Sequence, residues 1–437
     1  MTGYFAKFTA PVTRRAAIAL AALALTAGSA MAADPIKVWH HGGRADNERA
    51  RMEALIGDWN KANPSMPAVL EIQPEGAYNE QVQAAALSGG LPDLLDFDGP
   101  NYANYVWSGY LLPLNDLISK KVQDDALSSV IAQGTYPPDG KLYSLGVGDS
   151  GLAMWGRKSL LTAAGVRIPK GVDDAWTMAE FEEALEKLAT QPGIKYALDV
   201  KLNYGKGEWY TYGFSPMIQS AGADLVDRKS WTATGTLNSK AAVDVLGHLQ
   251  AWVKKGRVAP ASEGDDSFYG KKTSALSFVG HWMWPAHSKA FGDDLVLLPM
   301  PKWGAKHATG MGGWCWGITK TSKQAANTGK LLEYFMSTKV VSEMATAMGG
   351  VPGVKSAQPS VELYKDGGPL NLYIQQLSKG LGVPRPPHPA YPTITASFAE
   401  AIADIVDGAD VQKSLDKAAG RIYQDIKDNK GYPPFGK

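Results

Sequence analysis

The chain has 437 residues, and its 44 Lys and Arg nearly balance 43 Asp and Glu, for a formal net charge of +1. Such a balance gives no electrostatic reason to expect a nucleic acid or an anionic membrane as a partner. A single cysteine, Cys315, excludes an internal disulfide, and 13 Trp against 11 Phe indicate a need for large, flat, amphipathic surfaces.

Residues 1–32 have the composition of a cleaved signal peptide. Basic residues precede a short apolar run and a small-x-small pattern: Lys7, Arg14 and Arg15, then 16–27, then Ala30-Met31-Ala32. About a dozen apolar residues are too few to span a bilayer. We expect a mature chain that starts near Ala33 and is free in a bacterial periplasm, while the Sec and twin-arginine export routes both remain open. Cleavage removes three basic residues and no acidic one, so the formal charge becomes −2.

Strands and helices alternate in the first part of the mature chain. Apolar runs predict strands over 35–39, 69–72 and 94–97, and helical spacing of apolar residues predicts helices over 46–61 and 79–87. This alternation is typical of βαβ units and of a mostly parallel sheet.

The pattern restarts after a passage rich in Gly and Pro, 133–149. A capping box that begins at Thr177 opens a helix, and a second helix is expected over 239–255. Strands are expected over 194–198, 274–279 and 295–299, and the chain ends in helices over 322–337, 339–348, 393–407 and 411–428. Roughly 405 mature residues exceed one ordinary domain. The fold class expected is therefore α/β with two lobes, each a mostly parallel sheet flanked by helices.

Several short motifs, in order along nearly the whole mature chain, resemble the extracellular solute-binding proteins of carbohydrate ABC importers, the maltose-binding branch included. They are Gly89-Gly90-Leu91-Pro92-Asp93, 109–114 (GYLLPL), 140–145 (GKLYSL), 164–166 with Pro169 and 176–181 (WTMAEF), 280–284 (GHWMW) and 411–420 (VQKSLDKAAG). The resemblance implies a periplasmic binding protein fold with hinge crossings near 140–148, 299–310 and 349–358. It implies lobe 1 over 33–142 and 309–352, and lobe 2 over 143–308 and 353–437. It also implies a monomer that delivers a sugar to the membrane permease subunits of an importer.

Residues that follow the predicted strands are the candidates for ligand contact, because ligands of open α/β sheets bind beyond the carboxyl ends of strands. A sugar needs polar groups for its hydroxyls and aromatic faces for its C–H surfaces. The predicted ligand-binding residues are Trp39, His40, His41, Glu75, Asp98, Asn101, Trp209, His281, Trp282, Trp284, Gly313 and Trp314. The resemblance supports Trp282, where relatives stack a sugar ring.

Some of these positions keep a structural alternative. Asp98 and Asn101 are alternative candidates for one ligand contact as much as two residues that bind the ligand together. Asp98 also suits the N-cap of a following helix. Trp284 suits the core better than the ligand, and Trp209 is expected in a loop of the second lobe. His40 and His41 lack the spacing of a metal cluster, so no metal and no cofactor are expected.

Three other functions were weighed. Gly148-Asp149-Ser150-Gly151 spells a protease nucleophile motif, but this layout and its one Cys do not suit that all-β, disulfide-rich class. A glycoside hydrolase also combines carboxylates with Trp faces, yet no local signature marks an acid/base pair. Binding of another solute, such as glycerol phosphate, would need charged partners, and the edges of the predicted cleft are poor in Arg and Lys, with Arg44 as the nearest exception. The sequence therefore favours a non-catalytic protein that binds a di- or oligosaccharide.

Overall fold

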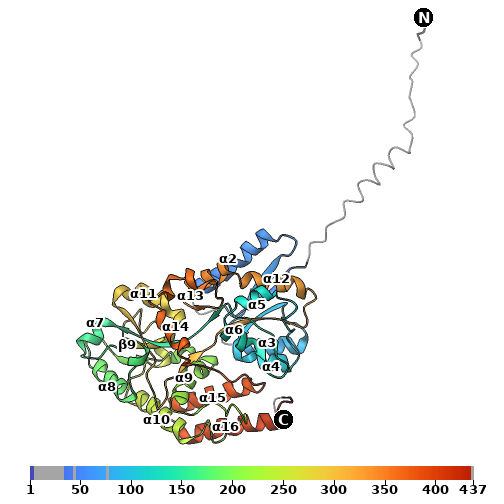
Figure 1. The fold of residues 1–437 in the computed structure, drawn as a ribbon. Helices are drawn as coiled ribbons and strands as arrows, with labels where there is room; N and C mark the ends of the chain where they lie inside the picture. The colour runs from blue at the N-terminus through green and yellow to red at the C-terminus, as the bar shows by residue number, and fades with distance from the viewer. Residues whose placement is uncertain (4–33, 43–45, 75–77, 435–437) are drawn as a thin grey trace.

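The computed structural model describes residues 1–3, 34–42, 46–74 and 78–434. Residues 4–32 of the predicted signal peptide and the predicted site residue Glu75 lie outside these described residues. Two four-stranded sheets organise the chain, each in its own lobe, and Figure 1 shows the lobes side by side with helices around both. None of the described helices combines the length and the apolar character that crossing a bilayer requires.

Lobe 1 is built on the sheet β12-β3-β1-β2. Its strands are β1 (Ile36–His40), β2 (Ala68–Ile72), β3 (Leu94–Asp98) and β12 (Trp314–Ile318). Its helices are α2 (Asp46–Ala62), α3 (Tyr78–Ser88), α4 (Tyr102–Trp107), α5 (Lys120–Asp125), α6 (Ser128–Gly134), α12 (Ala325–Phe335) and α13 (Thr338–Met348). β1 pairs in parallel with β2 and β3, as expected from the βαβ pattern, and only β12 runs antiparallel.

Both faces of the lobe 1 sheet are covered, which explains why its strands are apolar runs. Ile36 and Val38 of β1 belong to one cluster of buried side chains, whereas Leu95 and Phe97 of β3 belong to another. Because successive strand residues point to opposite faces, Trp39 packs with the second cluster, away from its neighbour His40.

Lobe 2 is built on the sheet β10-β7-β9-β8. Its strands are β7 (Leu152–Arg157), β8 (Tyr196–Asp199), β9 (Ser274–Gly280) and β10 (Leu295–Leu298). Its helices are α7 (Lys158–Ala163), α8 (Met178–Ala189), α9 (Glu208–Ser220), α10 (Lys240–Lys254), α11 (Trp284–Phe291), α14 (Asn371–Ser378), α15 (Tyr391–Val406) and α16 (Val411–Asp428). Here the expectation of a mostly parallel sheet is wrong: β7 is antiparallel to both β9 and β10, and only β8 and β9 are parallel.

Three passes of the chain join the lobes. The first and third pair as a short antiparallel ribbon, β6 (Gly148–Asp149) with β13 (Val351–Pro352). The second contains β11 (Thr309–Met311), which pairs in parallel with β14 (Gly382–Pro384). A separate hairpin, β4 (Thr135–Tyr136) and β5 (Lys141–Leu142), precedes the first pass.

The capping box at the start of α8 is present as predicted. The Thr177 hydroxyl accepts the Glu180 amide, and the Glu180 carboxylate accepts the Thr177 amide. The predicted loop around Trp209 is wrong, because Glu208 begins α9 directly after Gly207. This helix is buried along almost its whole length, so it lacks the polar face that reveals a surface helix in a sequence.

Candidate ligand-binding site

A cavity of about 570 Å³ lies between the two lobes, beside the chain passes that join them. Lobe 1 contributes the carboxyl ends of β1 and β3, the N-terminal half of α2, the first turn of α3, the start of β12 and one face of α13. Lobe 2 contributes the segment that leads into α9 and the turn after β9. The cavity therefore lies where open α/β sheets place their ligands, beyond the carboxyl ends of parallel strands.

Most of the predicted ligand-binding residues lie around this cavity. Its lining includes His40, His41, Asp98, Trp209, His281, Trp282, Gly313 and Trp314. Three others lie elsewhere. The indole of Trp39 donates to Glu71 at 2.7 Å, Trp284 packs against Trp155, and Asn101 is buried beneath the site, where it donates to the Asp98 carbonyl at 3.2 Å. Asp98 precedes a 3-10 helix but its side chain makes no capping hydrogen bond.

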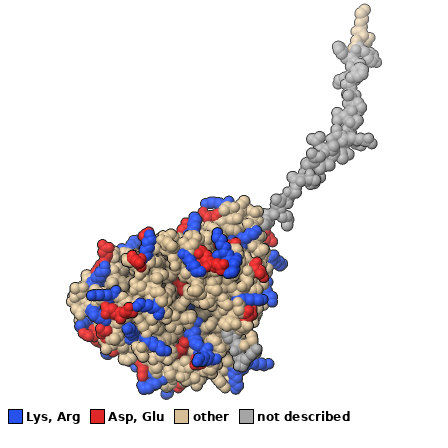
Figure 2. All heavy atoms as spheres, viewed as in Figure 1, with Lys and Arg blue, Asp and Glu red and all other residues tan. Residues whose placement is uncertain are grey.

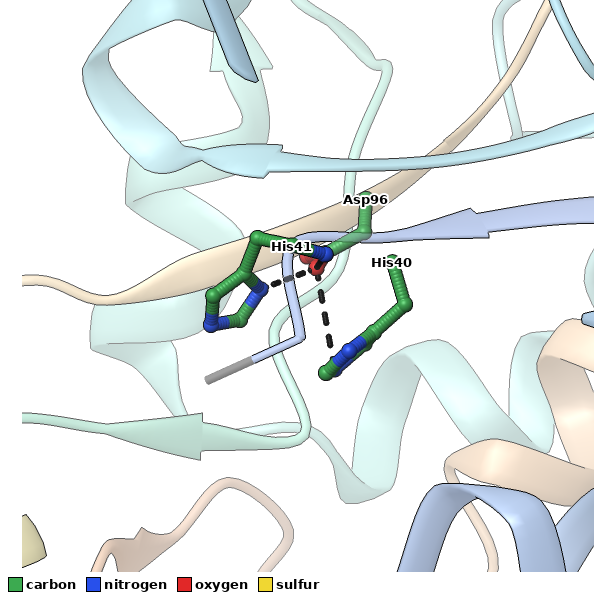
Figure 3. Close-up of side chains that lie close together, drawn as sticks. All are labelled: His40, His41 and Asp96. Atoms are coloured by element: carbon green, nitrogen blue, oxygen red, sulfur yellow. Dashed lines mark hydrogen bonds and ion pairs between the residues drawn. The ribbon is translucent and has the colours of Figure 1, made fainter. Parts of the chain in front are cut away.

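A histidine–carboxylate cluster forms the lobe 1 floor of the cavity, and Figure 3 shows both imidazoles turned toward Asp96. Nδ1 of His41 lies 2.5 Å from Oδ2 of Asp96, and Nε2 of His40 lies 3.7 Å from the same oxygen. The His41 ring stacks flat on Trp314, with centroids 3.5 Å apart. Glu48 of α2 closes the cluster at 3.4 Å from Nε2 of His41.

Burial sets the ionisation of this floor. It raises the pKa of Asp96 to about 7 and lowers the pKa of His40 to about 3, with His41 nearby adding to the lowering. His40 is therefore neutral. Its Nδ1 accepts the Gly42 amide at 3.0 Å, so the ring proton sits on Nε2, which points toward the carboxylates.

The same cluster places one ligand atom each from His40, His41 and Asp96 within 4.8 Å of one another, as a metal site would. Two ligands of one tetrahedral zinc ion stand about 3.3 Å apart, given metal–ligand bonds of about 2.0–2.1 Å. The 2.5 Å contact between His41 and Asp96 is too short for that arrangement, and His40 Nε2 carries a proton. The geometry is that of a hydrogen-bonded network.

A buried arginine joins the two lobes at one side of the cavity. Arg385, which follows β14, binds both oxygens of Asp98 at 2.6 and 2.8 Å, and also Oε1 of Glu208 at 2.5 Å. Tyr391 and Thr395 of α15 donate to the Glu208 carboxylate as well. Burial alone would lower the pKa of the Arg385 guanidinium, but the nearby Asp98 and Glu208 carboxylates have the larger effect and raise this pKa.

Ser150, Tyr212 and His281 form a second polar group at the chain passes. The Ser150 hydroxyl lies 2.9 Å from the Tyr212 hydroxyl and 3.1 Å from Nε2 of His281. Since Nδ1 of His281 donates to the Met348 carbonyl, its Nε2 is an acceptor. Burial lowers the pKa of His281 to about 4, which makes it a weak base, so this Ser–His pair does not favour the protease function excluded above.

Aromatic rings form the lobe 2 wall. Trp282 stands perpendicular to Trp209, with centroids 5.9 Å apart, and its Nε1 reaches the Tyr204 hydroxyl at 3.5 Å. Tyr212 lies 6.2 Å from Trp282. Trp314 belongs to the opposite lobe, so aromatic groups line both sides of the cavity.

Several lining residues were missed by the sequence analysis, namely Glu48, Tyr78, Asp96, Asp149, Tyr204, Glu208, Tyr212 and Arg385. Asp96 had a readable signal, since an acidic residue inside the apolar strand LLDFD must serve some purpose. Arg385 had none, because only the tertiary fold brings it to Asp98, 287 residues away in sequence. Cys315 is buried, and burial raises the pKa of its thiol.

Comparison with known proteins agrees with this architecture. A family model described as bacterial extracellular solute-binding protein matches residues 54–368. The chain belongs to this family. The two lobes and the cavity between them agree with membership of this family.

Solved structures show the same fold at low sequence identity. The GacH receptor of Streptomyces glaucescens, studied unliganded and with acarbose, is 22% identical with a TM-score of 0.74 over 92% of this chain and 99% of that one. The maltodextrin-binding MalE of Bdellovibrio bacteriovorus, bound to maltotriose, is 19% identical with a TM-score of 0.75 over 90% and 100%. UgpB of Mycobacterium tuberculosis, bound to glycerophosphocholine, is 20% identical with a TM-score of 0.75 over 91% and 99%.

Proposed function

We propose that this solute-binding protein captures a di- or oligosaccharide between its lobes and delivers it to the permease subunits of an ABC importer. The observation that carries the proposal is the lining of the cavity, which combines aromatic groups from both lobes with buried carboxylates and histidines. Aromatic faces cover the C–H surfaces of sugar rings, and carboxylates and imidazoles bind their hydroxyls. GacH and MalE, which have this fold, were solved with acarbose and maltotriose.

We also propose how the chain is exported and how its residues are divided between the two lobes. The chain is exported to the periplasm through a signal peptide at 1–32 and acts as a monomer without catalysis. Lobe 1 comprises 33–142 and 309–352, and lobe 2 comprises 143–308 and 353–437. Ligand contacts to both lobes favour the closed arrangement, which the importer then recognises.

Binding of an anionic solute such as glycerol phosphate is the second candidate, since UgpB was solved with glycerophosphocholine. The cavity does not favour it. The described lining has six carboxylates against two basic residues, and the buried one of these, Arg385, is already held by Asp98 and Glu208. A phosphate would meet repulsion there.

A thermal-shift screen of the mature protein tests the proposal. Mono-, di- and oligosaccharides are compared with glycerol phosphate, glycerophosphocholine and peptides. A ligand at about 100 times its Kd stabilises by about 2.7 kcal/mol, which raises the Tm by a few degrees. A selective shift with one saccharide class, without its consumption, is expected. A response to the controls alone, or release of a hydrolysis product, would overturn the proposal.

A further inference from the structure

The lining of the cavity carries a marked excess of negative charge. Its acidic residues are Glu48, Glu80, Asp96, Asp98, Asp149 and Glu208, and its basic residues are Lys206 and Arg385. With all six carboxylates ionised and the histidines neutral the formal charge is −4, and with Asp96 protonated, as its pKa of about 7 implies at pH 6.5, the charge is −3.

At three of the buried carboxylates, Asp98, Asp149 and Glu208, the described lining residues neutralise only one negative charge. Arg385 offsets one charge of the Asp98 and Glu208 pair that it bridges. Asp149 accepts hydrogen bonds from neutral donors, the Ser150 and Gly312 amides at 2.8 and 3.2 Å and the Gln133 side chain at 3.4 Å. Burial raises the pKa of both Asp149 and Glu208, as expected for carboxylates with too little positive charge nearby.

The aromatic wall of lobe 2 also suits a cation. The Arg385 guanidinium carbon lies 4.7 Å from the Tyr212 ring centroid, so this wall already holds one positive group in cation–π geometry. Trp209 and Trp282 extend the same wall toward Glu208, which follows Gly207 at the start of α9. An additional cation at this wall would meet ring faces and carboxylates together.

We propose that the saccharide bound in this cavity carries a protonated amine, so that the protein selects amino sugars over neutral and anionic sugars. The inference rests on the proposed function and deepens it by naming the substrate class. A neutral sugar satisfies hydrogen bonds but leaves the charge excess in place. An ammonium group on the ring offsets that excess and faces the aromatic wall, whereas an N-acetyl group has nearly the same position without the charge.

Isothermal titration with matched sugars tests this inference. Each amino sugar is paired with its N-acetylated form: glucosamine, galactosamine and chitobiose, at pH 6.5 and low salt, with cellobiose and maltose as neutral controls. We expect at least one amine to bind about tenfold or more tightly than its N-acetylated partner. That preference should shrink between 0.05 and 0.5 M NaCl, because salt screens the attraction.

The outcomes separate the two proposals. Neutral or N-acetylated sugars that bind as tightly as the amines would overturn the inference and leave the proposed function intact. Absence of binding by every saccharide would overturn both. If spermidine or choline binds but no sugar does, the charge argument holds and the sugar assignment fails, which also overturns the inference as stated.

A pair of variants supplies the control within the protein. Glu80, exposed at the cavity lining, is changed in Glu80→Gln, and Glu71, exposed and outside the lining, is changed in Glu71→Gln. Glu80→Gln should weaken binding of the amine about two- to fivefold, the range of an exposed charge pair, and should weaken binding of a neutral sugar less. Glu71→Gln should change neither, and equal effects of the two variants on the amine would contradict a local role for the lining charge.

Discussion

The indole of Trp282 folds back over Gly280, and a Cβ at residue 280 would overlap the ring. This contact fixes the ring in the wall of the cavity, half-buried and beside Trp209. Trp282→Ala should therefore weaken sugar binding by about 1–3 kcal/mol, the range for loss of a stacked aromatic contact. Calorimetric titration measures the effect.

Trp284 provides the matched control, because it is two residues away and packs against Trp155 outside the lining. Trp284→Ala should lower the Tm but leave the affinity of the folded protein unchanged. If Trp282→Ala folds normally and keeps its affinity, Trp282 does not contact the ligand.

Asp96 gives the fold a distinct pH dependence. Its pKa, raised by burial from an ordinary value of 3.8 to about 7, means that the folded protein holds this proton more tightly than the unfolded chain. The associated stability is fully present below about pH 4 and is lost as the pH rises through about 7. Asp96→Asn cannot titrate and keeps an oxygen for the His41 Nδ1–H.

The free energy of unfolding of Asp96→Asn relative to wild type should therefore rise between pH 5 and pH 8. Urea denaturation at several pH values measures it, and other titrating groups cancel in the comparison. A difference that stays constant over this range would contradict the raised pKa.

At the residue scale, the sequence predicted which residues lie near the cavity better than it predicted which way their side chains point. The rule that ligands bind after strand ends led to His40, His41 and Asp98, which line the cavity. It also led to Trp39, whose side chain points to the opposite face of the sheet from His40 because strand residues alternate. Asp96 was missed because it reaches the cavity from within a strand, whereas the rule considers only residues that follow a strand.

Helix caps allow a test at the scale of the elements. Thr177 makes a complete capping box at the start of α8, whereas Ser239 precedes α10 without a side-chain capping bond. Thr177→Ala should lower the free energy of unfolding by about 1 kcal/mol. Ser239→Ala should be neutral or stabilising, because its buried hydroxyl has no hydrogen-bond partner among the described residues. Urea denaturation compares them, and equal losses would show that α8 does not depend on its capping box.

Sequence periodicity predicted the elements that have one polar and one apolar face, and α8, α10 and α16 are found close to their expected ranges. It failed for α9, whose sequence EWYTYGFSPMIQS contains Gly213 and Pro216 and is buried along most of its length. Residues of this kind lower helix propensity, so packing against α15, α10 and β11 is needed to stabilise a helix there. This failure hid Glu208, which lies in the first turn of α9.

At the scale of the whole molecule, the order of strands and helices predicted two α/β lobes, but not how they meet. The contacts between lobes come from residues far apart in sequence. Asn104 of α4 donates to the Pro389 carbonyl at 2.7 Å, Trp107 donates to Pro433 at 3.0 Å, and Arg385 bridges to Asp98. No local pattern encodes such pairs, which is why the sequence left Asp98 with two interpretations and Arg385 with none.

The Arg385 bridge predicts how the relative position of the lobes can be changed. Asp98→Asn removes a buried charge from lobe 1 but leaves Arg385 paired with Glu208 of lobe 2, so each lobe keeps its internal contacts. Breaking one partner of a buried ion pair costs about 3–5 kcal/mol, more than enough to shift a two-state equilibrium between open and closed arrangements. We therefore expect a larger radius of gyration for the ligand-free variant by small-angle X-ray scattering, and a return toward the wild-type value at saturating ligand.

Glu186→Gln is the appropriate control for that measurement, because it removes one charge from a surface ion pair with Arg257 within lobe 2 alone. Its radius of gyration should equal that of the wild type. If Asp98→Asn is as compact as Glu186→Gln while its Tm falls, then Asp98 stabilises the folded chain without holding the lobes together. In that case ligand contacts alone would have to drive closure.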